Sequence, residues 1–196
     1  MTVSIIIPCK NEEDNILNKI NNLENKLSNI NFEIIIIDDY STDSTAKKIQ
    51  KASIEKQFLK YFHNDKKGLG GAINLGIKKS KEEFVCIFMA DMSDDPDDLV
   101  KYFNLIKNNK YDAVFGSRFM KGSKISDYPY FKLILNRFFN IFVQLLFFTK
   151  FNDTTNAFKL YNRKCLLELM PLISENFNIF LEIPLKIISR KYKFCV

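Results

Sequence analysis

Short apolar runs and longer amphipathic segments alternate along about the first 120 residues of the chain. Runs rich in Ile, Val and Phe predict β-strands at residues 3–8, 32–38, 59–63, 84–89 and 112–117. Apolar residues at helical spacing predict helices at residues 11–29, 41–53, 69–80 and 95–109. Strands that are apolar almost throughout and are joined by helices indicate a mostly parallel sheet with helices on both faces. The pattern therefore predicts an α/β fold.

The composition fits one globular domain spanning residues 1–196, with 46% hydrophobic and 27% charged residues. The formal net charge of +6 favours anionic partners, but the lysines are scattered over the predicted helices, so nucleic acid is not an expected partner. The four cysteines lie far apart without a Cys-x-x-Cys pair, which argues against a zinc site or a disulfide framework. The first residues carry no basic leader, and we expect a cytoplasmic protein.

Polar residues follow the predicted strands, and ligands of parallel α/β sheets bind outside the carboxyl ends of the strands. The first strand lacks the G-x-G-x-x-G sequence of dinucleotide-binding proteins after it. Asp39, at the end of the second strand, is either a ligand for a nucleoside base or ribose or a turn residue. Gly70 and Gly71 open a helix behind two lysines, without the Gly-Lys-Ser/Thr ending of a P-loop. They indicate either contact with a nucleotide or close packing of the helix on the sheet.

Five aspartates lie within residues 91–98 of this basic chain. Asp95 precedes Pro96, so it is the expected N-cap of a helix, and the two aspartates that follow would complement the helix dipole. Asp91 and Asp94 lie between the strand and this cap, where the ligand of the sheet would be. One or two carboxylates on such a loop suit Mg²⁺ or Mn²⁺ that shares its coordination with phosphates.

Six motifs in the order of a known family extend this interpretation over most of the chain. They are SIIIPCKNEEDNI, EIIIIDDYSTDST, GLGGAINLGI, MADMSDDPDDL, YDAVFGSRF and DTTNAFKLY. Together they resemble a family 2 glycosyltransferase of the GT-A fold, in the group of dolichol-phosphate mannose synthases and polyprenol-phosphate sugar transferases. The resemblance implies an enzyme that transfers a hexose from a GDP- or UDP-sugar and inverts the anomeric centre.

The resemblance also implies a nucleotide site. Residues that would border the nucleotide are Pro8, Lys10 and Glu12, and residues that would hold its base and ribose are Ile37 and Asp39. The Asp-x-Asp positions of the family are occupied by Met89, Ala90 and Asp91. The first metal-site aspartate is thus replaced by methionine. We therefore expect Mg²⁺ or Mn²⁺ to be held mainly by Asp91 and the diphosphate of the donor, with Ser93 and Asp94 as further ligands.

The acceptor decides which further groups the reaction needs. By resemblance, Arg118 and Lys132 would neutralise the charge that grows on the leaving diphosphate. A polyprenyl phosphate is already a dianionic nucleophile near neutral pH, and Arg137 would suit its phosphate. A glycan hydroxyl would instead need a base such as Asp94 or Asp153. We expect the lipid phosphate; the alternatives are a hydroxyl of a surface polysaccharide or lipopolysaccharide, and a catalytically weak nucleotide-sugar-binding module.

Residues 128–151 form an aromatic-rich segment that polar residues interrupt. It falls short of the roughly 20 mainly apolar residues of a membrane span, and it suits an amphipathic helix lying at the inner face of the cytoplasmic membrane. The alternative is a helix packed on the sheet or in a homodimer contact. Residues 181–196 predict a helix that leads into a strand, and because the family pattern continues beyond it, we expect a C-terminally truncated domain.

Overall fold

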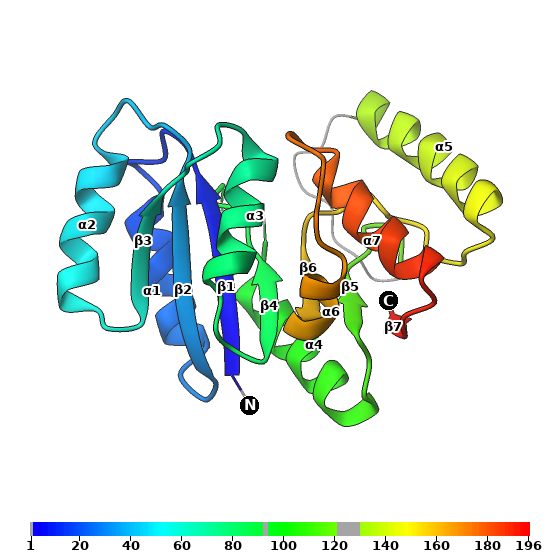
Figure 1. Cartoon of the computed structure of the whole chain (residues 1–196), viewed down its shortest axis with the longest axis horizontal. Coiled ribbons are helices and arrows are strands. Elements are labelled where there is room, and N and C mark those ends of the chain that lie inside the picture. The colour runs from blue at the N-terminus through cyan, green and yellow to red at the C-terminus, as the bar shows by residue number, and fades with distance from the viewer. Residues whose placement is uncertain (1, 92–93, 121–129) are drawn as a thin grey trace.

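The computed structural model describes residues 2–91, 94–120 and 130–196 and contains one seven-stranded sheet between two layers of helices (Figure 1). Its strands are β1 (Thr2–Cys9), β2 (Asn31–Asp38), β3 (Leu59–His63), β4 (Phe84–Ile87), β5 (Ala113–Phe115), β6 (Lys159–Asn162) and β7 (Phe194–Cys195). Their order in the sheet is β3-β2-β1-β4-β6-β5-β7. The pairs that β6 makes with β4 and β5 are antiparallel, and the other pairs are parallel.

Helices cover both faces of this sheet. They are α1 (Ile16–Lys26), α2 (Thr45–Glu55), α3 (Leu69–Lys79), α4 (Pro96–Asn109), α5 (Tyr130–Phe147), α6 (Arg163–Glu168) and α7 (Ile179–Ser189). One buried cluster joins α1, α2 and α4 to the sheet, and a second cluster joins α3, α6 and α7 to the opposite face. Helix α5 stands apart from both layers at one side of the molecule (Figure 1). The predicted mostly parallel α/β sheet with helices on both faces is confirmed.

The continuous apolar runs of the central strands follow from this two-sided burial. In β1, Ile5 and Ile7 face the cluster of α1, whereas Ile6 faces the cluster of α3, and all three are fully buried. Ile34 and Ile35 of β2 divide between the two clusters in the same way. Because successive side chains of a strand point to opposite faces, a strand covered on both sides needs apolar residues at every position.

Helix α4 begins as its sequence predicts. Asp95 has extended backbone angles, and its carboxylate accepts a hydrogen bond from the backbone N–H of Asp97 at 2.9 Å. Pro96 stands at the first helical position, where its missing N–H costs no hydrogen bond. The aspartates of the first turn and the cap thus start the helix, and this part of the acidic cluster has a structural explanation.

The predicted strands and helices of residues 3–117 correspond to β1–β5 and α1–α4, and the predicted C-terminal helix and strand correspond to α7 and β7. Strand β6 was missed. It begins with Lys159, a residue that interrupts the apolar pattern although its side chain is fully buried in the structure. A short antiparallel strand paired with residues about 75 positions earlier has no local signal of its own.

Candidate functional site

A cleft of about 570 Å³ opens where β1, β2 and β4 end, and we call it the larger cleft. It is lined by Pro8, Cys9, Lys10, Glu12, Asp39, Lys67, Gly68, Leu69, Met89, Ala90, Asp91, Asn176 and Phe177. The structure thus brings together the predicted nucleotide-binding residues from the first, second and fourth strand ends. Ile37 and Gly70 are the predicted residues that do not line it.

Ile37 and Gly70 have other roles in the structure. The side chain of Ile37 is fully buried in the cluster under α3. A Cβ atom on Gly70 would lie 1.9 Å from the carbonyl oxygen of Ser174, and the Gly70 N–H donates to the carbonyl of Glu175 at 2.8 Å. Close packing therefore explains Gly70, but its partner is the segment before α7 and not the sheet.

Asp39 shapes the turn that leads into α3. Its Oδ1 accepts hydrogen bonds from Asn64 Nδ2 at 2.7 Å and from the Gly68 N–H at 2.8 Å. Gly68 has a φ of +111°, a region that residues with a Cβ rarely adopt. The carboxylate at the strand end thus holds the glycine turn in place beside the larger cleft. Its predicted contact with a ribose stays a prediction.

The two unexplained aspartates of the acidic cluster point in different directions. Asp91 is exposed and lines the larger cleft. Asp94 is mostly buried, and its Oδ2 accepts the Met89 N–H at 2.9 Å. Burial raises the pKa of Asp94 to about 6, while the ammonium group of Lys19 opposes the rise. Asp94 therefore closes the turn after β4, and its predicted roles as metal ligand and base have no support from this geometry.

The metal site predicted at this turn is reduced to one carboxylate in the cleft. Ser93 lies outside the described residues. Within residues 2–91, 94–120 and 130–196, no group of three or more His, Cys, Asp and Glu side chains gathers to hold an ion. Mg²⁺ and Mn²⁺ bound through one or two carboxylates take their remaining ligands from phosphates and water. Asp91 fits such an ion only in the company of a bound diphosphate.

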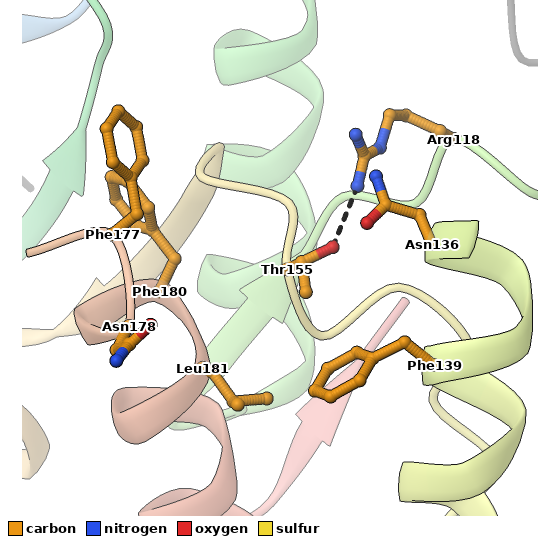
Figure 2. Close-up of a pocket in the computed structure, with 8 residues that line it drawn as sticks. All are labelled: Arg118, Asn136, Phe139, Thr155, Phe177, Asn178, Phe180 and Leu181. Carbon is orange, nitrogen blue, oxygen red and sulfur yellow. Dashed lines mark hydrogen bonds between the residues drawn. The ribbon is translucent and has the colours of Figure 1, made fainter. Parts of the chain in front are cut away.

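A second cavity of about 300 Å³, the smaller cavity, lies between α5 and α7 (Figure 2). It is lined by Arg118, Asn136, Phe139, Thr155, Phe177, Asn178, Phe180 and Leu181. Arg118, Asn136 and Thr155 lie together in it, Phe139 projects from α5, and the α7 side carries Phe177, Phe180 and Leu181 together with Asn178 (Figure 2). Phe177 also lines the larger cleft, so the two spaces adjoin.

Arg118 is oriented by a buried carboxylate. Its Nε and one terminal nitrogen donate to the two oxygens of Asp153 at 2.9 and 2.7 Å, and its backbone N–H donates to Asp153 at 2.8 Å. The same terminal nitrogen donates to Thr155 Oγ1 at 3.0 Å (Figure 2). Asp153 is 0% exposed, so its carboxylate does not face the smaller cavity as a general base would. The structure instead makes it the group that fixes Arg118.

Lys132 and Arg137 lie on α5, and both are exposed. The Arg137 guanidinium carbon lies 4.9 Å from the ring centre of Phe119, but neither residue lines the larger cleft or the smaller cavity. The structure therefore does not bring them to Asp91. Their predicted contacts with phosphates stay predictions.

Lys159 was not predicted from the sequence. Its ammonium group is fully buried beneath the loop that carries Thr155, and it donates to the carbonyls of Thr154, at 3.2 Å, and Asn156. Thr154 is also held from α5, because Asn140 Oδ1 accepts its N–H at 2.7 Å and its hydroxyl at 2.8 Å. These bonds fix one wall of the smaller cavity. The only signal in the sequence was a lysine among the apolar residues that end the motif DTTNAFKLY.

The buried ammonium of Lys159 gives a prediction about pH. Burial lowers the pKa of Lys159 to about 7, against the attraction of Asp153. Unfolded lysine keeps a pKa near 10.4, so above pH 7 the unfolded chain binds more protons than the folded chain, and stability rises with pH. Lys159 alone should raise the free energy of unfolding by about 1 kcal/mol from pH 7 to pH 8, and ionisation of the thiols in the unfolded chain offsets about half of this increase. Urea unfolding at both pH values measures this change.

The control separates Lys159 from the rest of the chain. The variant Lys159→Met should lose the increase, whereas Lys101→Met, which changes an exposed lysine, should keep it. The increase ends at about pH 8, because thiols then ionise in the unfolded chain, while burial raises the pKa of all four cysteines in the folded chain and reverses the slope. An equal increase in Lys159→Met would contradict this origin.

Comparison with solved structures identifies the type of α/β fold. The structure of TarS residues 1–349 from S. aureus superposes with a TM-score of 0.68 at 20% identity, covering 100% of this chain and 58% of that one. Glucosyl-3-phosphoglycerate synthase from Mycobacterium tuberculosis, solved with Mn²⁺, uridine diphosphate and phosphoglyceric acid, has a TM-score of 0.71 at 15% identity, covering 99% and 67%. The predicted GT-A fold is confirmed.

The sequence comparisons establish the family. Residues 4–170 match the model of glycosyl transferase family 2, and the chain belongs to this family. The dolichol-phosphate mannosyltransferase of Pyrococcus furiosus is 31% identical over 137 residues, which are 70% of this chain and 39% of that protein. The dolichyl-phosphate beta-glucosyltransferase of Dictyostelium discoideum is 31% identical over 189 residues, covering 87% and 57%. The chain thus spans less than two thirds of the length of these relatives, and the predicted family resemblance is confirmed.

Proposed function

We propose that the chain is an inverting glycosyltransferase that moves a hexose from a GDP- or UDP-sugar to a polyprenyl phosphate. The observation that carries this proposal is the pair of adjoining spaces, with Asp91 in the larger cleft and Arg118 in the smaller cavity. A nucleoside diphosphate fits the first, because backbone and polar groups gather there at the carboxyl ends of parallel strands. The names of the relatives from Pyrococcus furiosus and Dictyostelium discoideum, both lipid-phosphate glycosyltransferases, support the same acceptor class.

The residues of the smaller cavity favour a phosphate acceptor over a hydroxyl. Arg118 presents a guanidinium group whose orientation Asp153 and Thr155 fix, and guanidinium binds phosphate oxygens well. Asp94 and Asp153, the two predicted bases, are turned away from this cavity by their own hydrogen bonds. A phosphate dianion attacks without a base, whereas a hydroxyl would need one. The apolar side chains of Phe139, Phe180 and Leu181 in the same cavity suit the first carbons of a lipid.

In this reaction the residues of the chain bind, orient and neutralise. Asp39 holds the glycine turn at the wall of the larger cleft, and Asp91 would hold the divalent ion with the diphosphate of the donor. The ion, when bound, supplies positive charge that stabilises the leaving diphosphate. Because Arg118 lines the smaller cavity and not the larger cleft, its predicted role at the leaving diphosphate is replaced here: it would hold the acceptor phosphate near the anomeric carbon, on the side away from the diphosphate. In-line attack there would invert the anomeric centre.

A donor and acceptor panel tests this function. Radiolabelled GDP-mannose, GDP-glucose, UDP-glucose and UDP-N-acetylglucosamine are each incubated with the protein and a polyprenyl phosphate, with Mn²⁺ or with EDTA. We expect label from one donor in the lipid fraction, and no label when the matched polyprenol without phosphate replaces the acceptor. Transfer to the polyprenol or to a glycan would support the hydroxyl alternative. Binding of a donor without any transfer would support the nucleotide-sugar-binding module.

Helix α5 supports a membrane surface as the place of this reaction. It is the one helix among the described residues that is long and apolar enough to cross a membrane, and 11% of it is buried. However, α5 is tied to the domain. Its Asn140 accepts a hydrogen bond from the Thr154 N–H, and its Asn136 and Phe139 line the smaller cavity. A helix tied to the domain in this way suits a position within the interface, at the cytoplasmic face where nucleotide sugars occur. A second copy of the chain is the alternative partner for this face.

Vesicle binding distinguishes these partners. We expect the protein to sediment with vesicles that contain anionic lipid, and the double variant Phe142→Glu with Leu145→Glu to bind at least tenfold more weakly, because both side chains are exposed on α5. The matched control Ile54→Glu changes an exposed apolar residue on α2 and should bind like the parent protein. A dimer in gel filtration that the double variant abolishes, together with unchanged vesicle binding, would instead identify a homodimer contact.

A further inference from the structure

Phe177 stands at the boundary between the two spaces of the site. It is the residue that lines both the larger cleft and the smaller cavity, and 69% of its surface is exposed. Single exposed apolar residues are common on protein surfaces and need no functional explanation. The place of Phe177 is unusual, however, because it lines the larger cleft together with Asp91 and the smaller cavity together with Arg118.

The backbone that carries Phe177 is held from one side by α7. We call residues 172–178 the strap. The Glu182 carboxylate accepts the N–H groups of Ile173 at 3.0 Å and Ser174 at 2.8 Å, and it pairs with Lys186 at 2.7 Å. Although burial opposes it, these hydrogen bonds hold the pKa of Glu182 down to about 2. The carboxylate that accepts these hydrogen bonds is therefore ionised at physiological pH.

Helix α3 holds the strap from the other side. Asn74 donates to the carbonyl of Leu172 at 3.3 Å, and the Gly70 N–H donates to the carbonyl of Glu175 at 2.8 Å. A side chain at Gly70 would collide with the carbonyl of Ser174, so the glycine allows the strap to lie directly on the helix. Because the strap is held from both sides, the backbone of Phe177 is fixed between the larger cleft and the smaller cavity. The exposed ring of Phe177 is then a preformed surface.

The position of this ring matches one part of the donor. If the diphosphate lies in the larger cleft and the acceptor in the smaller cavity, the sugar that passes between them must lie at their boundary. One face of a hexopyranose ring carries mainly C–H groups, and such a face packs well on an aromatic ring. We propose that Phe177 is the surface on which the hexose of the donor packs, which makes it a residue that binds and positions the sugar. This inference rests on the proposed function.

Binding measurements with and without the sugar test this role. Calorimetric titration with UDP, UDP-glucose, GDP and GDP-mannose, each with Mn²⁺, first identifies the pair that the parent protein binds. In Phe177→Ala we expect about tenfold weaker binding of the nucleotide sugar and less than twofold change for the nucleoside diphosphate. Phe177→Tyr should bind the nucleotide sugar within threefold of the parent. Ile173→Ala, which removes an exposed side chain from the same strap, should change neither affinity.

The outcomes separate this inference from the function on which it rests. Phe177→Ala with unchanged affinity for the nucleotide sugar, or with equal losses for the nucleotide with and without sugar, would overturn the role of Phe177 alone. If the parent protein binds none of the four compounds, the proposed function and this inference both fail. A selective loss for the nucleotide sugar that Ile173→Ala reproduces would assign the effect to the strap and would also overturn the role of the ring.

Discussion

Replacement of Asp91 by Asn is expected to lower the rate of sugar transfer by about 100- to 1000-fold. Among the described carboxylates of the turn after β4, Asp91 lines the larger cleft, whereas Asp94 accepts a hydrogen bond from the Met89 N–H. Met89 supplies no negative charge at the position where the family usually has aspartate. The change keeps the shape of the side chain but removes the charge that would hold a divalent ion. Initial rates with the active donor and acceptor measure the loss.

Two further measurements assign this loss to metal binding. Asp97→Asn makes the same change on an exposed residue of α4 that pairs with Lys26, and it should keep its rate within twofold of the parent. We also expect Mn²⁺ to strengthen binding of the nucleoside diphosphate to the parent protein but not to Asp91→Asn. A rate for Asp91→Asn within threefold of the parent would show that the site, which already has Met89 in place of the family aspartate, also works without the carboxylate of Asp91.

The acidic cluster shows which features of a site can be predicted from sequence. Asp95 and Pro96 form the start of α4 as predicted, because a helix cap depends on the residue itself and on its next neighbours. Asp94 was predicted to face the ligand with Asp91, but it turns inward to the Met89 N–H. The direction of a side chain in a loop depends on backbone hydrogen bonds that the sequence pattern does not carry.

The smaller cavity was predicted only in part for a related reason. Its walls come from residues 118, 136, 139, 155, 177, 178, 180 and 181, which meet through the antiparallel strand β6 and the separate helix α5. Arg118 was named through the family resemblance, whereas Phe177 lies in an irregular segment without a motif. The larger cleft was predicted better, because its residues follow strands and the carboxyl ends of parallel strands meet at one edge. The position of a residue at the end of a parallel strand can thus be predicted, whereas the position of a residue in an irregular segment cannot.

Removing only Arg118 from its ion pair with Asp153 should lower the free energy of unfolding more than replacing both residues. In Arg118→Met, the fully buried Asp153 loses its guanidinium partner, and we expect the free energy of unfolding to fall by about 3 kcal/mol. In Asp153→Asn the loss should be smaller, because Arg118 is 23% exposed and keeps contact with water. Urea unfolding of each variant measures both changes. The surface pair of Asp98 and Lys101 provides the control, since Asp98→Asn should cost less than about 1 kcal/mol.

The double variant separates stability from function at this pair. Asn at position 153 keeps an oxygen that accepts the backbone N–H of residue 118, so Arg118→Met with Asp153→Asn should recover much of the stability that Arg118→Met loses. Transfer should not recover, because the guanidinium that faces the smaller cavity is still absent. Recovery of both would reduce Arg118 to a structural residue and remove the support it gives to a phosphate acceptor. Recovery of stability alone would leave Asp153 as the residue that positions Arg118, and Arg118 as the group that meets the acceptor.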